Sequence, residues 1–111
     1  MFFVNSGSAA TDLAIRIAQT HTSKKKILVL EHGYHGNTHL AIDISAYKYN
    51  QQGGPGQKEY ILQTPMPKVF GSGFEDEEEA AENFSRLTFE QLLENKGQIA
   101  AFIAEPIVGC G

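Results

Sequence analysis

Ile27-Leu28-Val29-Leu30 is the stretch that decides the fold, because it is an unbroken run of aliphatic and β-branched residues. Such a run predicts a strand that is buried on both faces, which is typical of parallel sheets covered by helices. The run follows three lysines, Lys24-Lys25-Lys26, and is followed by a turn at residues 33–36. The sequence therefore predicts an α/β protein with a mostly parallel sheet and helices on both faces.

Helical and extended patterns alternate on either side of this strand. Residues 2–4 predict a buried strand end, and residues 10–22 carry apolar side chains at helical spacing, with Ser8 or Thr11 as the expected N-cap. The later patterns predict a short helix at 38–46, a short strand at 60–62, a helix starting in the acidic run 75–79, a second helical start at 88–91 and a buried strand at 99–104. This order is the one that builds a parallel sheet.

The composition excludes several classes of protein. The 111 residues are 41% hydrophobic and 10% aromatic, which is too apolar for a disordered chain. A formal net charge of −4 argues against a nucleic acid or an anionic membrane as partner. Cys110 is the only cysteine, so an internal disulfide is excluded and a reducing, cytoplasmic location is expected. No apolar stretch approaches the roughly 20 residues of a membrane span.

The pentad Asn5-Ser6-Gly7-Ser8-Ala9 lies between the first predicted strand and the first predicted helix. Gly7 has no Cβ, so the backbone can come close to an anion there. The first N–H groups of the next helix lack intrahelical partners and lie at the positive end of its dipole. The pentad lacks the lysine of a P-loop and the spaced glycines of a dinucleotide motif. It therefore predicts a phosphate site, with an ordinary serine-capped turn as the alternative.

Two further polar clusters follow predicted strands, at residues 32–35 and at Glu105. Ligands of parallel α/β sheets collect outside the carboxyl ends of the strands, so the three clusters are expected to meet there. Tyr34 offers a flat face on which a planar ring could stack. Glu105 would be costly to bury unpaired, so it is expected to face a polar cleft or a cation; a strand-end glutamate facing solvent is the alternative.

Three nearby histidines, His32, His35 and His39, suggest a zinc site at first sight. Their spacing differs from His-Glu-x-x-His, and no well-placed cysteine or carboxylate pair completes a tetrahedral set. We therefore expect no metal site. Cys110 is expected to be a packed residue beside a glycine turn.

Three segments together resemble the class III aminotransferases, which are fold type I enzymes that use pyridoxal 5′-phosphate (PLP). These segments are residues 3–10 (FVNSGSAA), 31–36 (EHGYHG) and 104–107 (AEPI). The resemblance covers nearly the whole chain and keeps the order and approximate spacing of the family's motifs. It implies that residues 1–111 are part of the large, cofactor-binding domain of a longer enzyme. It also implies small-molecule amine or amino-acid and keto-acid substrates, and a homodimer.

The resemblance also implies a role for each motif. The expected cofactor-binding residues are Ser6, Gly7, Ser8, Tyr34, His35 and Glu105. Gly7 and Ser8 would hold the phosphate of PLP at the helix start, and Tyr34 would stack on the pyridine ring. Glu105 would lie near the cofactor and the substrate. His35 belongs to the same motif as Tyr34 and is expected to pack rather than to transfer protons.

The catalytic lysine of the family is expected to be missing from this chain. PLP chemistry needs a lysine for the Schiff base and an acid beside the pyridine nitrogen. In the family both follow the position of Glu105, and none of the seven lysines of the sequence matches a catalytic position. We therefore expect the 111-residue chain to be inactive alone and its parent protein to be an aminotransferase.

Two other functions stay open on the sequence. Residues 41–49 and 56–60 resemble the branch that contains ethanolamine-phosphate and phosphohydroxylysine phospho-lyases. That branch shares the cofactor but eliminates phosphate from a phosphorylated amine. A non-catalytic α/β module that binds a phosphorylated ligand is the other alternative.

Overall fold

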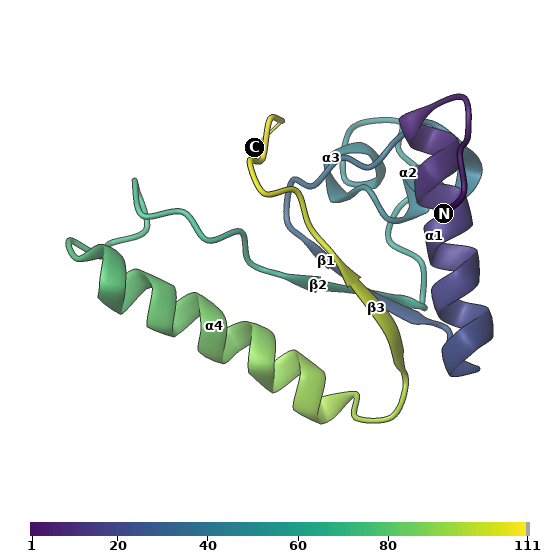
Figure 1. The fold of residues 1–111 in the computed structure, drawn as a ribbon. Helices are drawn as coiled ribbons and strands as arrows, with labels where there is room; N and C mark the ends of the chain where they lie inside the picture. Colours follow the sequence, from purple (N-terminus) through teal and green to yellow (C-terminus); the bar gives the residue numbers. More distant parts are fainter. Residues whose placement is uncertain (111) are drawn as a thin grey trace.

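A three-stranded sheet forms the centre of the computed structural model, which describes residues 1–110 (Figure 1). Its strands are β1 (Lys26–Leu30), β2 (Ile61–Thr64) and β3 (Ile99–Ile103), in the spatial order β2-β1-β3. Strand β1 pairs in parallel with both neighbours. The prediction of an α/β fold with a mostly parallel sheet is therefore confirmed.

Strand β1 is the centre of the sheet and of the hydrophobic core. Ile27, Leu28 and Val29 have no exposed surface. Because side chains alternate along a strand, Ile27 and Val29 share one face and Leu28 lies on the other. The buried cluster on the first face comprises Ile15, Ile27, Val29, Ile44, Ala46, Tyr49 and Ile61. Each large aliphatic side chain buried in this way stabilises the fold by roughly 1.5–3 kcal/mol.

Helix α1 (Gly7–Thr22) covers that first face through Ile15. Its N-cap is Ser6, which has extended backbone angles and whose Oγ accepts a hydrogen bond from the Ala9 N–H at 3.1 Å. The predicted start near residue 10 and the predicted caps were therefore wrong. Ser8 cannot cap the helix, because it lies within the first turn and its Oγ binds another loop.

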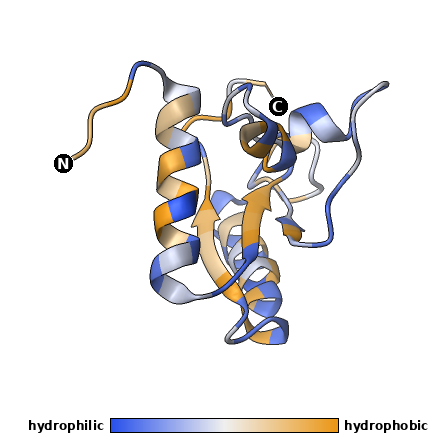
Figure 2. Ribbon diagram, turned by 90° about the vertical axis from the view of Figure 1, so that its right-hand side faces the viewer, coloured by the Kyte–Doolittle hydropathy of each residue, from blue (hydrophilic) through white to orange (hydrophobic). Residues whose placement is uncertain are grey.

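The segment before α1 is an exposed arm and contains no strand. Figure 2 shows it as a hydrophobic strip that leaves the N-terminus of α1 and lies apart from the sheet. Phe2 and Phe3 are both largely exposed. The prediction of a buried strand end at residues 2–4 is wrong, because the sheet of the described residues leaves no strand beside this segment for pairing.

Two short helices replace the single helix predicted over residues 38–46. They are α2 (His39–Asp43) and α3 (Ala46–Tyr49). The helix breaks at Ser45, which is fully buried and has non-helical backbone angles. The break turns the Ser45 hydroxyl toward the loop that follows β1, where it takes part in the candidate site.

Helix α4 (Glu77–Glu94) lies on the opposite side of the sheet from α1 (Figure 1). Asp76 caps it by accepting a hydrogen bond from the Glu78 N–H at 3.0 Å, and three glutamates in the first turn complement the helix dipole. The predicted second start at Thr88 is wrong. Thr88 lies inside a continuous helix and donates its hydroxyl hydrogen to the Phe84 carbonyl at 2.9 Å.

Strand β3 is more exposed than the sequence predicts. Within the described part of the chain it pairs with β1 on one side only, and Phe102 is 50% exposed. Cys110 is exposed as well, so the prediction of a packed cysteine is wrong. Within residues 1–110, no helix is both long and apolar enough to cross a membrane.

The raised pKa of the buried Tyr49 leads us to expect that the folded protein loses stability at high pH. Its hydroxyl donates to Gln63 Oε1 at 2.9 Å, and burial together with the negative charge of Glu31 raises its pKa to about 12. An unfolded tyrosine ionises near pH 10, so its contribution to stability is complete below about pH 10 and is lost as the pH rises toward 12. We expect the melting temperature of the full-length protein to fall over this range, and Tyr49→Phe to fall less steeply. Parallel curves for the two proteins would contradict this.

Candidate functional site

The N-terminus of α1 presents two backbone donors. The N–H groups of Ala9 and Ala10 are already satisfied by Ser6. Its Oγ accepts from the Ala9 N–H, and its carbonyl accepts from the Ala10 N–H at 3.0 Å. Among the residues that the structure describes, the N–H groups of Gly7 and Ser8 have no acceptor. They lie at the positive end of a 16-residue helix, where a phosphate or carboxylate is stabilised.

The loop that follows β1 packs directly against this helix start. The Asn37 N–H donates to Ser8 Oγ at 3.0 Å. Gly36 has a φ of +130°, and a Cβ at this position would lie 2.9 Å from Ser8 Cα, so the contact leaves no room for a side chain. Together the helix start and the loop line a pocket of about 420 Å³, formed by Gly7, Ser8, Thr11, Tyr34, His35 and Gly36.

Glu105 connects the end of β3 to the same loop. Its Oε2 accepts a hydrogen bond from the Tyr34 N–H at 3.0 Å. The partner of this half-buried carboxylate is therefore a backbone amide of a neighbouring strand-end loop. The bond fixes the backbone of Tyr34, whose ring lines the pocket.

His35 is held by its backbone. Its N–H donates to Ser45 Oγ at 2.8 Å, and the Ser45 hydroxyl donates in turn to the Ala41 carbonyl at 2.5 Å. Nε2 is buried and has no hydrogen-bond partner among the described residues. Burial lowers the pKa of His35, and the negative charge of Glu105 opposes this only in part. A neutral, closely packed imidazole fits the predicted packing role.

The structure thus brings the three predicted polar clusters to one edge of the sheet. Ser6 does not line the pocket and acts as the cap of α1. Glu105 does not line it either, and contacts the site through the Tyr34 N–H. The exposed His32 and His39 do not take part. In residues 1–110 no group of three His, Cys, Asp or Glu side chains is placed to hold a metal ion.

The sequence reasoning missed two residues that shape the pocket. Asn37 joins the loop to the helix start, and Ser45 holds the His35 backbone. A signal for each was present, because Asn37 follows a glycine at a turn and Ser45 interrupts an apolar helical pattern. Their partners are distant in the sequence, however, so the pattern alone did not identify them.

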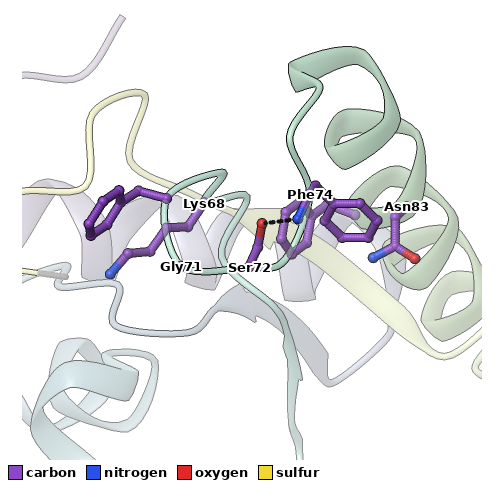
Figure 3. Close-up of a pocket in the computed structure, with 7 residues that line it drawn as sticks. Lys68, Gly71, Ser72, Phe74 and Asn83 are labelled. Carbon is purple, nitrogen blue, oxygen red and sulfur yellow. Dashed lines mark hydrogen bonds between the residues drawn. The ribbon is translucent and has the colours of Figure 1, made fainter.

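A second pocket, of about 480 Å³, lies between the loop after β2 and the start of α4 (Figure 3). Its lining includes Lys68, Gly71, Ser72, Phe74 and Asn83. The Ser72 hydroxyl accepts a hydrogen bond from the Phe74 N–H at 3.3 Å, so the loop is held mainly by its own residues. None of the predicted site residues lines this pocket.

The fold and the site define a class of protein before any relative is considered: a parallel α/β domain in which a helix start with two unbonded backbone N–H groups lies, among the described residues, at the carboxyl edge of the sheet. Taurine:2-oxoglutarate aminotransferase from Bifidobacterium kashiwanohense, solved in complex with PLP and glutamate, has this fold, with a TM-score of 0.82 and 26% sequence identity. The match covers 97% of this chain and 25% of that chain.

The sequence comparison defines the family. The model of the aminotransferase class-III family matches residues 1–111, so the chain belongs to the class III aminotransferase family. It is 38% identical over 118 residues to an alanine–glyoxylate aminotransferase 2-like protein of Drosophila melanogaster, covering 99% of this chain and 24% of that protein. It is 39% identical over 70 residues to an ethanolamine-phosphate phospho-lyase homolog of Caenorhabditis elegans, covering 63% of this chain and 15% of that protein. The chain thus spans at most about a quarter of these proteins.

Proposed function

We propose that this chain is the part of a PLP-dependent class III aminotransferase that binds the cofactor. The longer protein would transfer an amino group between an amine or amino acid and a keto acid or aldehyde. The observation that carries the proposal is the pair of 3.0 Å hydrogen bonds, Asn37 N–H to Ser8 and Tyr34 N–H to Glu105, which join three strand-end and helix-start segments around one pocket. Membership of the family supports it.

The residues of the pocket fit PLP. The unpaired N–H groups of Gly7 and Ser8 suit its phosphate, and Tyr34 lines the same pocket with an aromatic ring that suits its pyridine ring. When bound, PLP supplies an electron sink for bond breaking at the amine-bearing carbon of a substrate. The residues of this chain bind and orient: the helix start holds the anion, Tyr34 supports the ring, and Glu105 holds Tyr34 in place.

The group that would move protons is outside this chain. The seven lysines match no catalytic position of the family, and the known relatives are about four times longer. We therefore assign the activity to the full-length protein. Continuing the reading frame past residue 111 should reveal an aspartate and then a lysine, and their absence would contradict the proposal.

A direct assay tests the reaction. The full-length protein, supplied with PLP, is expected to convert an amino acid and a keto acid into the exchanged pair. Binding of a phosphorylated ligand without any PLP-dependent activity would contradict the proposal and favour a non-catalytic module.

A phospho-lyase is the second candidate, and the Caenorhabditis elegans relative is the observation that favours it. The two reactions differ in their need for an acceptor. Release of inorganic phosphate from phosphoethanolamine without a keto acid would exclude the transaminase. Amino transfer that stops when the keto acid is omitted would exclude the phospho-lyase.

We also propose a homodimer and a cytoplasmic location. The family resemblance supports the first, and the single cysteine supports the second. Light scattering of the full-length protein is expected to give twice the monomer mass, and cell fractionation is expected to recover the protein with cytosolic markers.

Glu105 should govern cofactor affinity through the Tyr34 backbone. In the full-length protein, Glu105→Ala leaves the Tyr34 N–H without its carboxylate partner, and we expect PLP binding to weaken by about tenfold. Glu105→Gln keeps an acceptor oxygen and should weaken binding less. Titration of the apoprotein with PLP measures both, and equal losses in the two variants would contradict a role that depends on accepting this hydrogen bond.

A further inference from the structure

A lysine stands over the aromatic ring that lines the pocket. Lys48 Nζ lies 5.8 Å from the centroid of the Tyr34 ring and 5.3 Å from that of Tyr47. The two tyrosine rings contact each other in a T-shaped arrangement, with their centroids 6.5 Å apart. The ammonium group of Lys48 therefore lies against both tyrosine rings, and one of them, Tyr34, lines the candidate site.

Helix α3 brings Lys48 and Tyr47 to this place by backbone bonds to the site loop. The Tyr47 N–H donates to the Gly33 carbonyl at 3.2 Å, next to Tyr34. At the N-terminus of α3, Ser45 holds the His35 N–H from the other side. The short helix and the loop are thus joined through their backbones, which places the Cα of Lys48 within side-chain reach of the Tyr34 ring.

The ammonium group of Lys48 lies near Tyr34 but is not part of the pocket lining. The only ion pair among the described residues joins Arg86 and Glu90, so Lys48 has no carboxylate partner there. The rings of Tyr34 and Tyr47 are therefore the contacts that hold the charged end of this side chain.

We propose that Lys48 and Tyr47 are positioning residues that set the plane of the Tyr34 ring for stacking on the cofactor. The inference rests on the proposed function, since it needs PLP in the pocket. Tyr47 restricts the ring by its edge-to-face contact, and Lys48 restricts it by the cation–π contact. With the ring held before the cofactor arrives, less conformational freedom is lost on binding.

The test compares Lys48→Met with Lys48→Arg in the full-length protein. Methionine keeps the length of the chain and removes the charge, whereas arginine keeps a cation that can lie over both rings. We expect Lys48→Met to bind PLP about two- to fivefold more weakly and to change the circular dichroism of the bound cofactor. Lys48→Arg should restore both. Lys58→Met, in an exposed loop, serves as the matched control and should leave both unchanged.

Three outcomes would overturn the inference. Wild-type affinity and circular dichroism in Lys48→Met would show that the ring needs no support from Lys48. A raised KM for the amine substrate with unchanged PLP binding would assign Lys48 to the substrate. A clear fall in the melting temperature of Lys48→Met, together with the weaker PLP binding, would indicate a general loss of structure. Failure of the wild-type protein to bind PLP would instead overturn the proposed function itself.

Discussion

Replacing Gly36 by alanine is expected to weaken PLP binding to the full-length protein by about a hundredfold. The new Cβ would lie 2.7 Å from Ser8 Oγ and 2.9 Å from Ser8 Cα, distances that real Cβ atoms do not show. The φ of +130° adds strain for any residue with a side chain. The clash would push the loop away from Ser8. Because the Ser8 N–H is one of the two donors proposed to bind the phosphate, this movement would disturb the phosphate site.

A control at Gly56 separates the effect of the steric clash from that of the backbone strain. Gly56 has a φ of +77°, and an added Cβ there would meet no atom within 4 Å. Gly56→Ala therefore carries backbone strain without a clash, at a position that does not line the pocket, and should leave PLP affinity unchanged. Titration of both apoproteins with PLP makes the comparison. If Gly36→Ala binds PLP as the wild type does, the loop does not shape the phosphate site.

Replacing Ile27 by alanine is expected to give the largest loss of stability, about 2–5 kcal/mol of unfolding free energy. Ile27 is fully buried in the central strand and belongs to the cluster that joins α1, β2 and α3. Because the surrounding structure relaxes only in part around a shortened core side chain, a cavity would remain. Denaturant unfolding of the full-length protein, followed by far-ultraviolet circular dichroism, gives the shift of the midpoint.

Ile17→Ala is the matched control for this cavity. The same side chain is removed from α1, but Ile17 is 46% exposed in the structure and fills no enclosed space. Its expected loss is below about 1 kcal/mol, because little apolar area returns to water. If the two variants unfold at the same denaturant concentration, Ile27 does not occupy the core of the folded protein.

The sheet was predictable because its signal is local. The apolar run at β1 identifies a strand buried on both faces without any knowledge of its neighbours, and the structure places it at the centre. The meeting of the three polar clusters was also predictable, since parallel strands end at one edge. The hydrogen bond from the Tyr34 N–H to Glu105 joins the loops that follow β1 and β3, as this rule predicts.

The helix boundaries that could not be predicted are the start of α1 and the break between α2 and α3, where several nearby residues are able to cap or interrupt a helix. Ser6, Ser8 and Thr11 are all able to cap a helix. In the structure Ser6 is the cap, and the Ser8 hydroxyl instead binds the Asn37 N–H of another segment. The break between α2 and α3 likewise depends on Ser45 bonding to a loop ten residues away. Such choices are made by tertiary contacts, which a local pattern does not contain.

The position of β1 between its two neighbours has a consequence for the order in which the protein is assembled during synthesis. The partners of β1 in β2 leave the ribosome long before those in β3, so Ile27 and Ile61 can pair while Phe102 is still untranslated. The helix start and the Tyr34 loop also precede β3 in the chain. Glu105 follows β3, so the carboxylate that accepts the Tyr34 N–H is the last of these site groups to be synthesised, and until then the Tyr34 loop lacks this hydrogen bond.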